Sequence, residues 1–485
     1  MNRTRILVFV ATAALSSCAT ETPEQQILSD AASALGGRDI IESTASLTIE
    51  GEGSMGNLGQ DMTPDATSQH FAVTDYRRTV DLNQARARTE QTRTPDFNYF
   101  RGPGPMTQSF GIDGDVAYSM APDGSASRAP EASSRSQRIA YYHHPLTLVR
   151  AALAPDAAVT NARVEGPERL VDITTADGNT LTLAIEDGSG LPSRITSLDH
   201  HPNLRDVTRT TRFSSYEDVD GLTLPTRLVR SIDDFEELVL EVSMQSLGAD
   251  TGDLTAPESA TSAAPITGPP PANVTAEPVA DGVWFLAGES HHSVLVEMSD
   301  HVVLIEAPNE VRTLAVVEKA RAVVPDKPLT HLVNTHHHFD HSGGVRAAIS
   351  EGLTIVTHES NAAFYEELGA RPSTIEADAL ARNPQDVSVV SVGDELTLGD
   401  DSMRLVLYPI DGNPHGSAIL MAYLPDHRLL VQADAFSPGR NYQPFAANLL
   451  SNVETRELLV ERIVPIHGGI TPFEGLVDAV KAMTN

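Results

Sequence analysis

A segment with almost nothing to bury divides this chain into two parts with different patterns. The segment covers residues 249–276 and contains the run Ala256–Pro271, which is rich in Pro, Ala, Ser and Thr and ends in three consecutive prolines. Such a composition is typical of an extended linker. Each flanking part is long enough to bury a core of its own. We therefore expect two domains, at 24–248 and 277–485, and we expect a protein that begins near Val274 to fold and to keep its activity.

The first part reads as a mainly antiparallel β domain. Runs of alternating polar and apolar residues, such as 181–186 and 237–244, are separated by Asp-Gly and Gly-Ser turns. Helices are expected at Gln25–Leu35, ended by two glycines, and at Tyr141–Leu153. The pairs His143–His144 and His200–His201 are expected at the surface or in turns. This part shows no catalytic constellation.

The second part alternates short apolar strands with helical patterns. Strands are expected at 293–298, 301–305, 329–334, 353–357 and 462–466, near Val387 and Arg404, and in a hairpin of 419–424 with 429–432. Helices are expected at 311–322, 343–349, 360–368, 448–458 and 473–483. This interleaving indicates an α/β layered domain.

A histidine-rich motif directly follows the strand expected at 329–334. It reads Thr335-His-His-His-Phe-Asp-His-Ser-Gly-Gly344. Imidazole nitrogens and a carboxylate oxygen are ligands that suit a divalent metal such as zinc. His336 and His338 alternate along the chain and can share one ion, while Asp340 and His341 can turn toward a second.

The pattern His-x-His-x-Asp-His followed by Ser-Gly-Gly resembles the signature of the metallo-β-lactamase superfamily. The resemblance implies an αββα sandwich over about residues 280–485 and three further ligands, which His415, Asp434 and His467 match in order. By this resemblance His336, His338 and His415 bind one metal, Asp340, His341 and His467 bind the other, and Asp434 bridges the two.

The resemblance also implies the chemistry. Two divalent ions, for which Zn²⁺ is the expected metal, would generate hydroxide that attacks an ester, thioester, lactone or amide carbonyl. Asp340 would be catalytic as well as a ligand, because it could orient the hydroxide and carry a proton to the leaving group. A true β-lactamase is one alternative, although subclasses that bind zinc through Cys are excluded. A second alternative is a ligand-binding lipoprotein of the cell envelope whose metal domain is degenerate.

Several other residues of the second part carry expectations. The resemblance places an acidic residue that supports a ligand at Glu306. His291 and His292 lie on the loop after the first strand, which in the resembling family can overhang the metals, and they are expected at the surface, with substrate contact as the alternative. His337 is expected to point away from the metals, and His358 is expected in a structural role. Tyr442, Phe445 and Asn448 are candidates to line the pocket.

The start of the chain predicts export. Residues 1–17 combine two arginines, an apolar run at 6–15 and small residues, as in a secretory signal peptide. Leu15-Ser-Ser-Cys18 resembles the lipobox of bacterial lipoproteins, so Cys18, the only cysteine, is the expected lipidation site. We therefore expect an outer-membrane lipoprotein facing the periplasm, or alternatively a soluble periplasmic protein.

The charge of the chain excludes one class of partner. Asp and Glu number 66 against 34 Lys and Arg, a net charge of −32. Such a surface repels phosphate backbones, so no nucleic acid is expected. We expect a small-molecule substrate and membrane attachment through Cys18 alone, and the sequence sets no oligomeric state.

Overall fold

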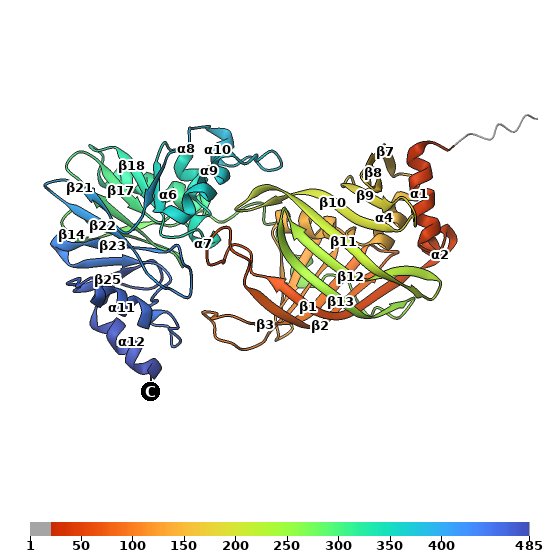
Figure 1. The fold of residues 1–485 in the computed structure, drawn as a ribbon, viewed down its shortest axis with the longest axis horizontal. Helices are drawn as coiled ribbons and strands as arrows, with labels where there is room; N and C mark the ends of the chain where they lie inside the picture. Colours follow the sequence, from red (N-terminus) through yellow and green to blue (C-terminus); the bar gives the residue numbers. More distant parts are fainter. Residues whose placement is uncertain (1–20, 485) are drawn as a thin grey trace, which may run out of the picture.

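The computed structural model describes residues 21–484, which form two lobes joined side by side (Figure 1). The predicted signal peptide, residues 1–17, and the predicted lipidation site Cys18 lie outside the described residues. Within them, no helix is long and apolar enough to cross a membrane.

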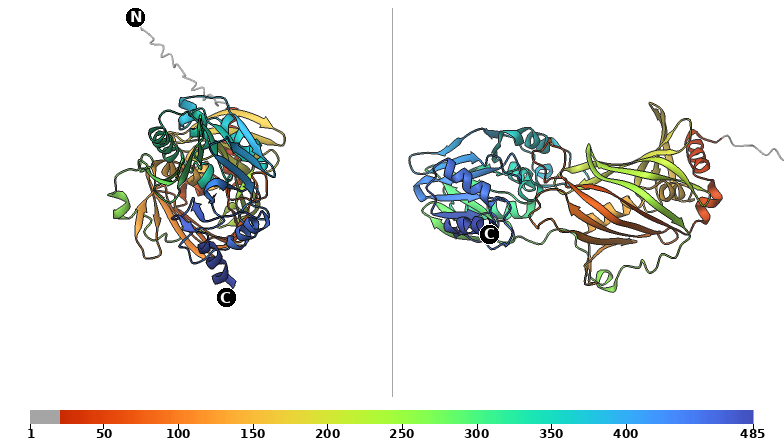
Figure 2. Two further views of the ribbon diagram at one scale, coloured as in Figure 1. Left: turned by 90° about the vertical axis from the view of Figure 1, so that its left-hand side faces the viewer. Right: turned by 60° about the horizontal axis from the view of Figure 1, so that its bottom comes forward.

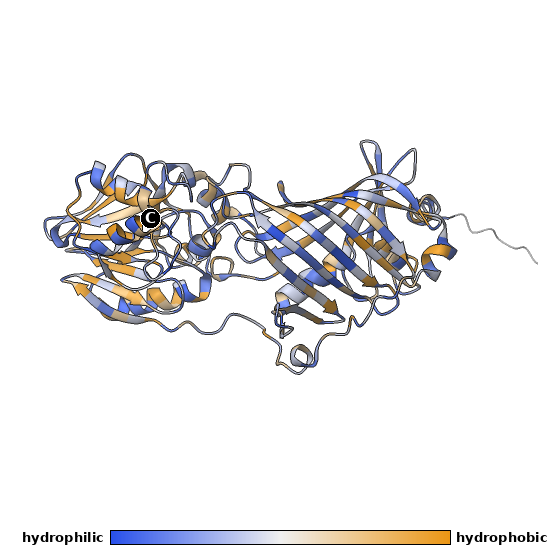
Figure 3. Ribbon diagram, turned by 90° about the horizontal axis from the view of Figure 1, so that it is seen from below, coloured by the Kyte–Doolittle hydropathy of each residue, from blue (hydrophilic) through white to orange (hydrophobic). Residues whose placement is uncertain are grey.

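The N-terminal lobe is one curved antiparallel sheet. Its strand order is β6-β5-β4-β3-β2-β1-β13-β12-β11-β10-β9-β8-β7, so its first and last strands pair at the centre. Polar and apolar residues alternate along its strands (Figure 3), which confirms the antiparallel β prediction. The strands are β1 Ser46–Gly56, β2 His70–Asp81, β3 Arg86–Pro95, β4 Met106–Asp113, β5 Val116–Met120, β6 Ala126–Arg128, β7 Ala158–Glu165, β8 Glu168–Thr174, β9 Thr180–Glu186, β10 Pro192–His201, β11 Arg205–Val219, β12 Leu222–Ile232 and β13 Phe235–Leu247.

Helices α1 to α4 contribute to the apolar core that this sheet forms. The predicted first helix is confirmed as α1, Pro23–Ala34, and is followed by α2, Arg38–Ser43. The helix predicted at 141–153 is instead two helices, α3 Glu131–Tyr141 and α4 Pro145–Ala152. The break falls at His144, whose backbone is extended because the ring of a following proline disfavours the helical conformation.

The histidine pairs of this lobe are less exposed than expected. His143 and His144 are buried, and His143 lies 2.9 Å from the hydroxyls of both Thr211 and Ser197. His200 is buried as well, whereas His201 ends β10 beside a turn, and its Nδ1 accepts the backbone N–H of Leu204 from that turn. The surface prediction was wrong for the buried rings because neighbouring hydroxyls and packing replace water around them.

The linker is partly ordered on the N-terminal lobe. It runs back along this lobe as an extended chain (Figures 2 and 3). A short helix, α5 Glu258–Thr261, buries Ala260 against the buried Tyr118. The linker therefore packs on one domain before it reaches the other.

The C-terminal lobe contains two mixed sheets packed face to face with helices outside, which confirms the αββα prediction. The seven-stranded sheet consists of β14 Thr275–Ala280, β15 Val283–Ala287, β16 Ser293–Glu297, β17 Val302–Ile305, β18 Leu329–Val333, β19 Thr354–His358 and β20 Val389–Val392. The six-stranded sheet consists of β21 Leu396–Gly399, β22 Arg404–Pro409, β23 Leu420–Leu424, β24 Leu429–Gln432, β25 Arg462–Pro465 and β26 Thr471–Pro472. One apolar core lies between the sheets.

Two further cores lie between the sheets and their helices. The helices of this lobe are α6 Glu310–Val323, α7 Phe339–Ser342, α8 Val345–Ser350, α9 Ala362–Ala370, α10 Ala379–Arg382, α11 Ala446–Thr455 and α12 Glu474–Thr484, with 3₁₀ turns η1 Glu359–Asn361 and η2 Pro425–His427. Strands β17 to β20 run parallel. Their carboxyl ends therefore meet at one edge, where the histidine motif begins.

Polar side chains hold the two lobes together. Arg371, just after α9, donates to the carboxylate of Asp233 at 2.5 Å and to the carbonyl of Leu204 at 2.6 Å. Asp206 accepts the backbone N–H of Thr374 at 2.8 Å. These contacts place the turns at the ends of β10 and β12 against the site-bearing edge of the C-terminal lobe.

Candidate metal centre

The histidine motif lies where β18 leaves the sheet. Residues 334–338 are irregular and α7 follows at once, so the chain turns sharply within the motif. His336, His338 and His341 are all buried. Buried imidazoles in a short irregular segment can point several nitrogen atoms into one space.

The first group comprises His336, His338, His415 and Asp434, whose potential ligand atoms all lie within 4.8 Å of one another. Nδ1 of His338 lies 3.0 Å from Nε2 of His415. Nε2 of His336 is buried without a hydrogen-bond partner. Neutral imidazole nitrogens in this arrangement could hold a divalent ion.

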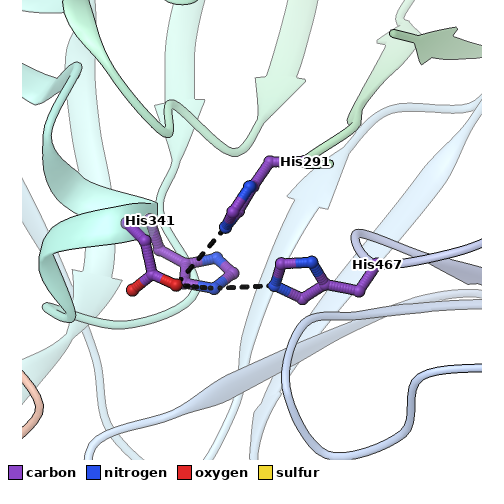
Figure 4. A group of neighbouring side chains, drawn as sticks. His291, His341 and His467 are labelled. Carbon is purple, nitrogen blue, oxygen red and sulfur yellow. Dashed lines mark hydrogen bonds and ion pairs between the residues drawn. The ribbon is translucent and has the colours of Figure 1, made fainter. Parts of the chain in front are cut away.

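The second group comprises His291, Asp340, His341 and His467, again within 4.8 Å. Figure 4 shows the rings of His291, His341 and His467 pointing toward one another. Nε2 of His467 lies 3.3 Å from Nε2 of His341, and Nε2 of His291 lies 3.3 Å from the Asp340 carboxylate. This group could hold a second ion.

The carboxylate of Asp434 lies between the two groups. One oxygen, Oδ2, is 2.8 Å from Nε2 of His415 in the first group. The other oxygen, Oδ1, is 2.8 Å from Nε2 of His467 in the second group. A carboxylate with one oxygen toward each group has the geometry of a bridging ligand.

Protein oxygens fix which nitrogen of these rings is free. Nδ1 of His341 donates to Glu306 at 2.7 Å, Nδ1 of His467 donates to the carbonyl of Ser290 at 3.0 Å, and Nε2 of His338 donates to the carbonyl of Asp61 at 2.9 Å. In each ring the other nitrogen faces the centre. Such outer hydrogen bonds select the tautomer and orientation that a metal ligand needs.

The charged groups of the centre favour a cation at this position. Burial favours the neutral form of Asp434, but the nearby His341 and His415 hold its pKa well below the usual range. Burial also opposes protonation of His341, yet Asp434, Asp340 and Glu306 raise its pKa well above the ordinary value. Three carboxylates around one buried imidazole therefore favour a cation at this position.

Glu306 supports the motif from the end of β17. Its side chain is fully buried, and it accepts the backbone N–H of Thr335 at 2.7 Å as well as the ring of His341. Its backbone has φ of 78°, a left-handed conformation that costs a non-glycine residue roughly 1–2 kcal/mol. The expected position of Glu306 beside a ligand is the position seen in the structure.

The N-terminal lobe reaches into the centre, which the sequence analysis missed. Besides the Asp61 carbonyl at His338, the side-chain amide of Gln60 donates to Asp340 at 2.8 Å. The carbonyl of Gly59 accepts the backbone N–H of Phe339 at 3.0 Å. A loop of the first half therefore contacts two candidate ligands, while the folding and activity of a protein that begins near Val274 stay a prediction. No sequence signal marks this loop.

Phe339 connects the motif to the N-terminal lobe. Its ring packs with Leu204, Val207 and Ile232, which are buried residues of that lobe. Gly59 lies directly on the ring, since a Cβ added there would come 2.2 Å from it. The residue between two candidate ligands is therefore held by the neighbouring domain.

A cavity of about 370 Å³ opens onto the two groups, a size suited to a small molecule. Tyr442 and Phe445 line it as expected, whereas Asn448 does not and instead donates to the carbonyl of Asp411. Its wall also includes Phe100 and Arg101 of the N-terminal lobe.

The remaining histidines follow the expectations in part. His337 is buried, belongs to neither group, and packs against Phe364. His358 ends β19 and accepts the backbone N–H of Ser360, a structural role as expected.

The surface prediction for His291 was wrong, because its loop folds over Asp340. The position of His291 on the loop before β16 was the sequence feature that could have indicated this contact. Its neighbour His292 packs against Phe285 instead.

The C-terminal lobe is a metallo-β-lactamase superfamily domain. Residues 286–477 match the family model described as the metallo-beta-lactamase superfamily. Similar solved structures include a metallo-β-lactamase from Pontibacter korlensis, 19% identical with a TM-score of 0.35, which covers 44% of this chain and 100% of that one. The mono-zinc form of FIM-1 from Pseudomonas aeruginosa is 17% identical with a TM-score of 0.35 over 44% of this chain and 97% of that one.

Two curated relatives each match part of the chain. The 2,4-dinitroanisole O-demethylase subunit alpha of Nocardioides sp. is 24% identical over 36% of this chain and 52% of its own length. A protein of Methanocaldococcus jannaschii is 24% identical over 41% of this chain and 46% of its own length. The chain thus spans about half the length of the curated relatives it matches.

Proposed function

We propose that this protein is a metal-dependent hydrolase with a dinuclear centre. His336, His338 and His415 would hold one ion, Asp340, His341 and His467 the other, and Asp434 would join them. The observation that carries the proposal is the Asp434 carboxylate, whose two oxygens each lie 2.8 Å from a histidine of a different group.

The donor set fits two divalent ions, and zinc is the metal that it favours. All the donors are imidazole nitrogens or carboxylate oxygens, which zinc binds readily. The outer nitrogens of three rings are already engaged by protein oxygens, and the buried Nε2 of His336 has no hydrogen-bond partner. When bound, two such ions would activate water at neutral pH and polarise a carbonyl oxygen.

The chain's own residues would position the reaction. The Gln60 amide and the His291 ring hold the Asp340 carboxylate from two sides, at 2.8 Å and 3.3 Å. The charge of His341 and the hydrogen bond from His291 outweigh burial and lower the pKa of Asp340. The Asp340 carboxylate, held in this position, could accept a proton and pass it to a leaving group.

The substrate class we propose is a small ester, thioester, lactone or amide. The cavity size and the carbonyl chemistry of a dinuclear centre support it. A β-lactam is one candidate amide. Cleavage of an aryl ether is a further candidate, because one relative bears the name of a 2,4-dinitroanisole O-demethylase subunit.

We also propose that the protein is exported and attached to the outer membrane through Cys18. The basic start, the apolar run and the Leu15–Cys18 motif support this proposal. A lipid anchor would place the hydrolase on the periplasmic side of the membrane.

Metal analysis of purified variants tests the proposed function. Wild type is expected to hold about two zinc ions per chain. Asp434→Ala should lose one ion together with hydrolysis, whereas His337→Ala, a neighbour in neither group, should keep both. Turnover should be sought with lactones, thioesters, esters, nitrocefin and 2,4-dinitroanisole. One ion or none in the wild type, or equal losses in the two variants, would contradict the assignment.

A further inference from the structure

Two arginines from different domains meet at the mouth of the cavity. Arg101 lies on the loop between β3 and β4 of the N-terminal lobe, and Arg440 follows the turn after Asp434 in the C-terminal lobe. Their guanidinium carbons lie 5.2 Å and 5.0 Å from the ring centroid of Phe100. One cation from each domain thus contacts the same aromatic ring.

Neither arginine has an acidic partner. Among residues 21–484, no carboxylate oxygen lies within 4.0 Å of either guanidinium group. The chain has 66 acidic and 34 basic residues, and Arg135, Arg205 and Arg371 each pair with a carboxylate across the contact between the lobes. Both side chains are exposed, so their hydrogen-bond donors face the cavity opening or water.

The net charge of the chain makes this placement informative. A charge of −32 repels an anionic small molecule from most of the surface. Two unpaired guanidinium groups at the opening offset that repulsion locally and provide the planar donor pairs that bind carboxylate or phosphate. The aromatic side chains of Phe100, Tyr442 and Phe445 give the wall beyond them an apolar character.

We propose that the substrate carries an oxyanion group, a carboxylate or a phosphate, which Arg101 and Arg440 bind while the carbonyl to be cleaved lies at the candidate metal centre. The proposal rests on the proposed function. It assigns the N-terminal lobe a part in substrate selection, because Phe100 and Arg101 both belong to that lobe.

Paired substrates test this assignment. Mono-4-nitrophenyl adipate and 4-nitrophenyl hexanoate have acyl chains of equal length, and only the adipate ester bears a carboxylate. The purified wild type should prefer the adipate ester in kcat/KM. Arg101→Gln and Arg440→Gln should each reduce the adipate-to-hexanoate ratio about tenfold, mainly through KM, which corresponds to about 1.4 kcal/mol. Arg212→Gln, which removes an exposed arginine of β11 outside the cavity, should leave the ratio unchanged.

Measuring the binding of ether analogues to the protein tests the anion site without requiring ester hydrolysis. Calorimetry with 6-(4-nitrophenoxy)hexanoate and 6-(4-nitrophenoxy)hexyl phosphate, which contain no ester carbonyl at the aryl group, should show weaker binding to both variants. The tighter of the two ethers identifies the preferred oxyanion. Unchanged ester ratios and unchanged ether affinities in the variants would overturn the inference, while hydrolysis of the hexanoate ester would still support the proposed function. If neither ester is hydrolysed, the proposed function loses support and the ether affinities alone decide the anion site.

Discussion

The backbone carbonyl of Asp61 accepts a hydrogen bond from Nε2 of His338 at 2.9 Å, across 277 positions of sequence. This bond leaves Nδ1 of His338 facing the first group of candidate ligands. The loop that carries Asp61 belongs to the N-terminal lobe, so the geometry of the centre depends on contact between the lobes.

Displacing this loop should weaken metal binding. Gly59→Ala places a methyl group into the ring of Phe339 at a backbone φ of 77°. We expect zinc affinity to fall about tenfold, the lower end for loss of an outer hydrogen bond to a ligand. Competition with a chromophoric chelator measures the change.

Gly178→Ala is the matched control. Gly178 lies between β8 and β9 with φ of 86°, and a Cβ there would meet nothing within 4 Å. Both variants carry a similar backbone strain of about 1 kcal/mol. Equal zinc affinities in the two variants would contradict a role for the loop.

Loss of the Glu306 charge should weaken the second group selectively. Glu306 binds Nδ1 of His341 at 2.7 Å in a fully buried position. Glu306→Gln should lower the affinity for the second zinc by about 10- to 100-fold and change the first less, because only His341 loses its carboxylate partner. Stepwise zinc titration separates the two sites. Glu297→Gln, which removes only a partner of Lys327, should behave as wild type.

Acid should destabilise the N-terminal lobe through its buried histidines. Burial, followed by the charges of Arg230 and Arg209, lowers the pKa of His143 to about 3 from 6.5. The unfolded chain therefore binds the proton first, and the folded state loses up to about 1.4 kcal/mol per pH unit between pH 6.5 and 3. His143→Gln should reduce the stability difference between pH 7 and pH 5 by about 2 kcal/mol.

Urea unfolding of the full chain at both pH values measures this difference. His427→Gln removes a half-buried histidine of η2 in the other lobe and should leave this difference unchanged. An identical pH dependence in wild type and His143→Gln would show that the buried ring does not titrate on unfolding.

Lipid anchoring makes a separate prediction at Cys18, which lies outside the described residues. Cys18→Ser should move the protein from the membrane pellet to the soluble periplasmic fraction, because the acylated side chain is lost. Glu21→Gln, beyond the Leu15–Cys18 motif, should stay in the pellet. Continued pelleting of the Cys18 variant with outer membranes would rule out the anchor.

The sequence by itself determined the layers of both lobes and the composition of the centre. Polar and apolar residues alternate along the strands of the N-terminal lobe, and strand and helix patterns interleave in the αββα sandwich. Both patterns are visible in the sequence because a buried face requires apolar residues at regular spacing. His336, His338, Asp340 and His341 are near neighbours along the chain, so their shared use could be inferred from spacing alone. His415, Asp434 and His467 follow from the resemblance to a family that places them in this order.

Only the tertiary structure decided which groups from distant positions join that centre. Gln60 and Asp61 reach it through a domain contact, and His291 reaches it because its loop folds over Asp340. The same contact between the lobes brings Arg101 to the mouth of the cavity. The burial of His143 likewise depends on hydroxyls from β10 and β11. Every residue has a backbone carbonyl, so the sequence does not indicate which carbonyl will bind a ligand ring. A contact between domains has no periodic sequence pattern, so it could not be predicted from the sequence either.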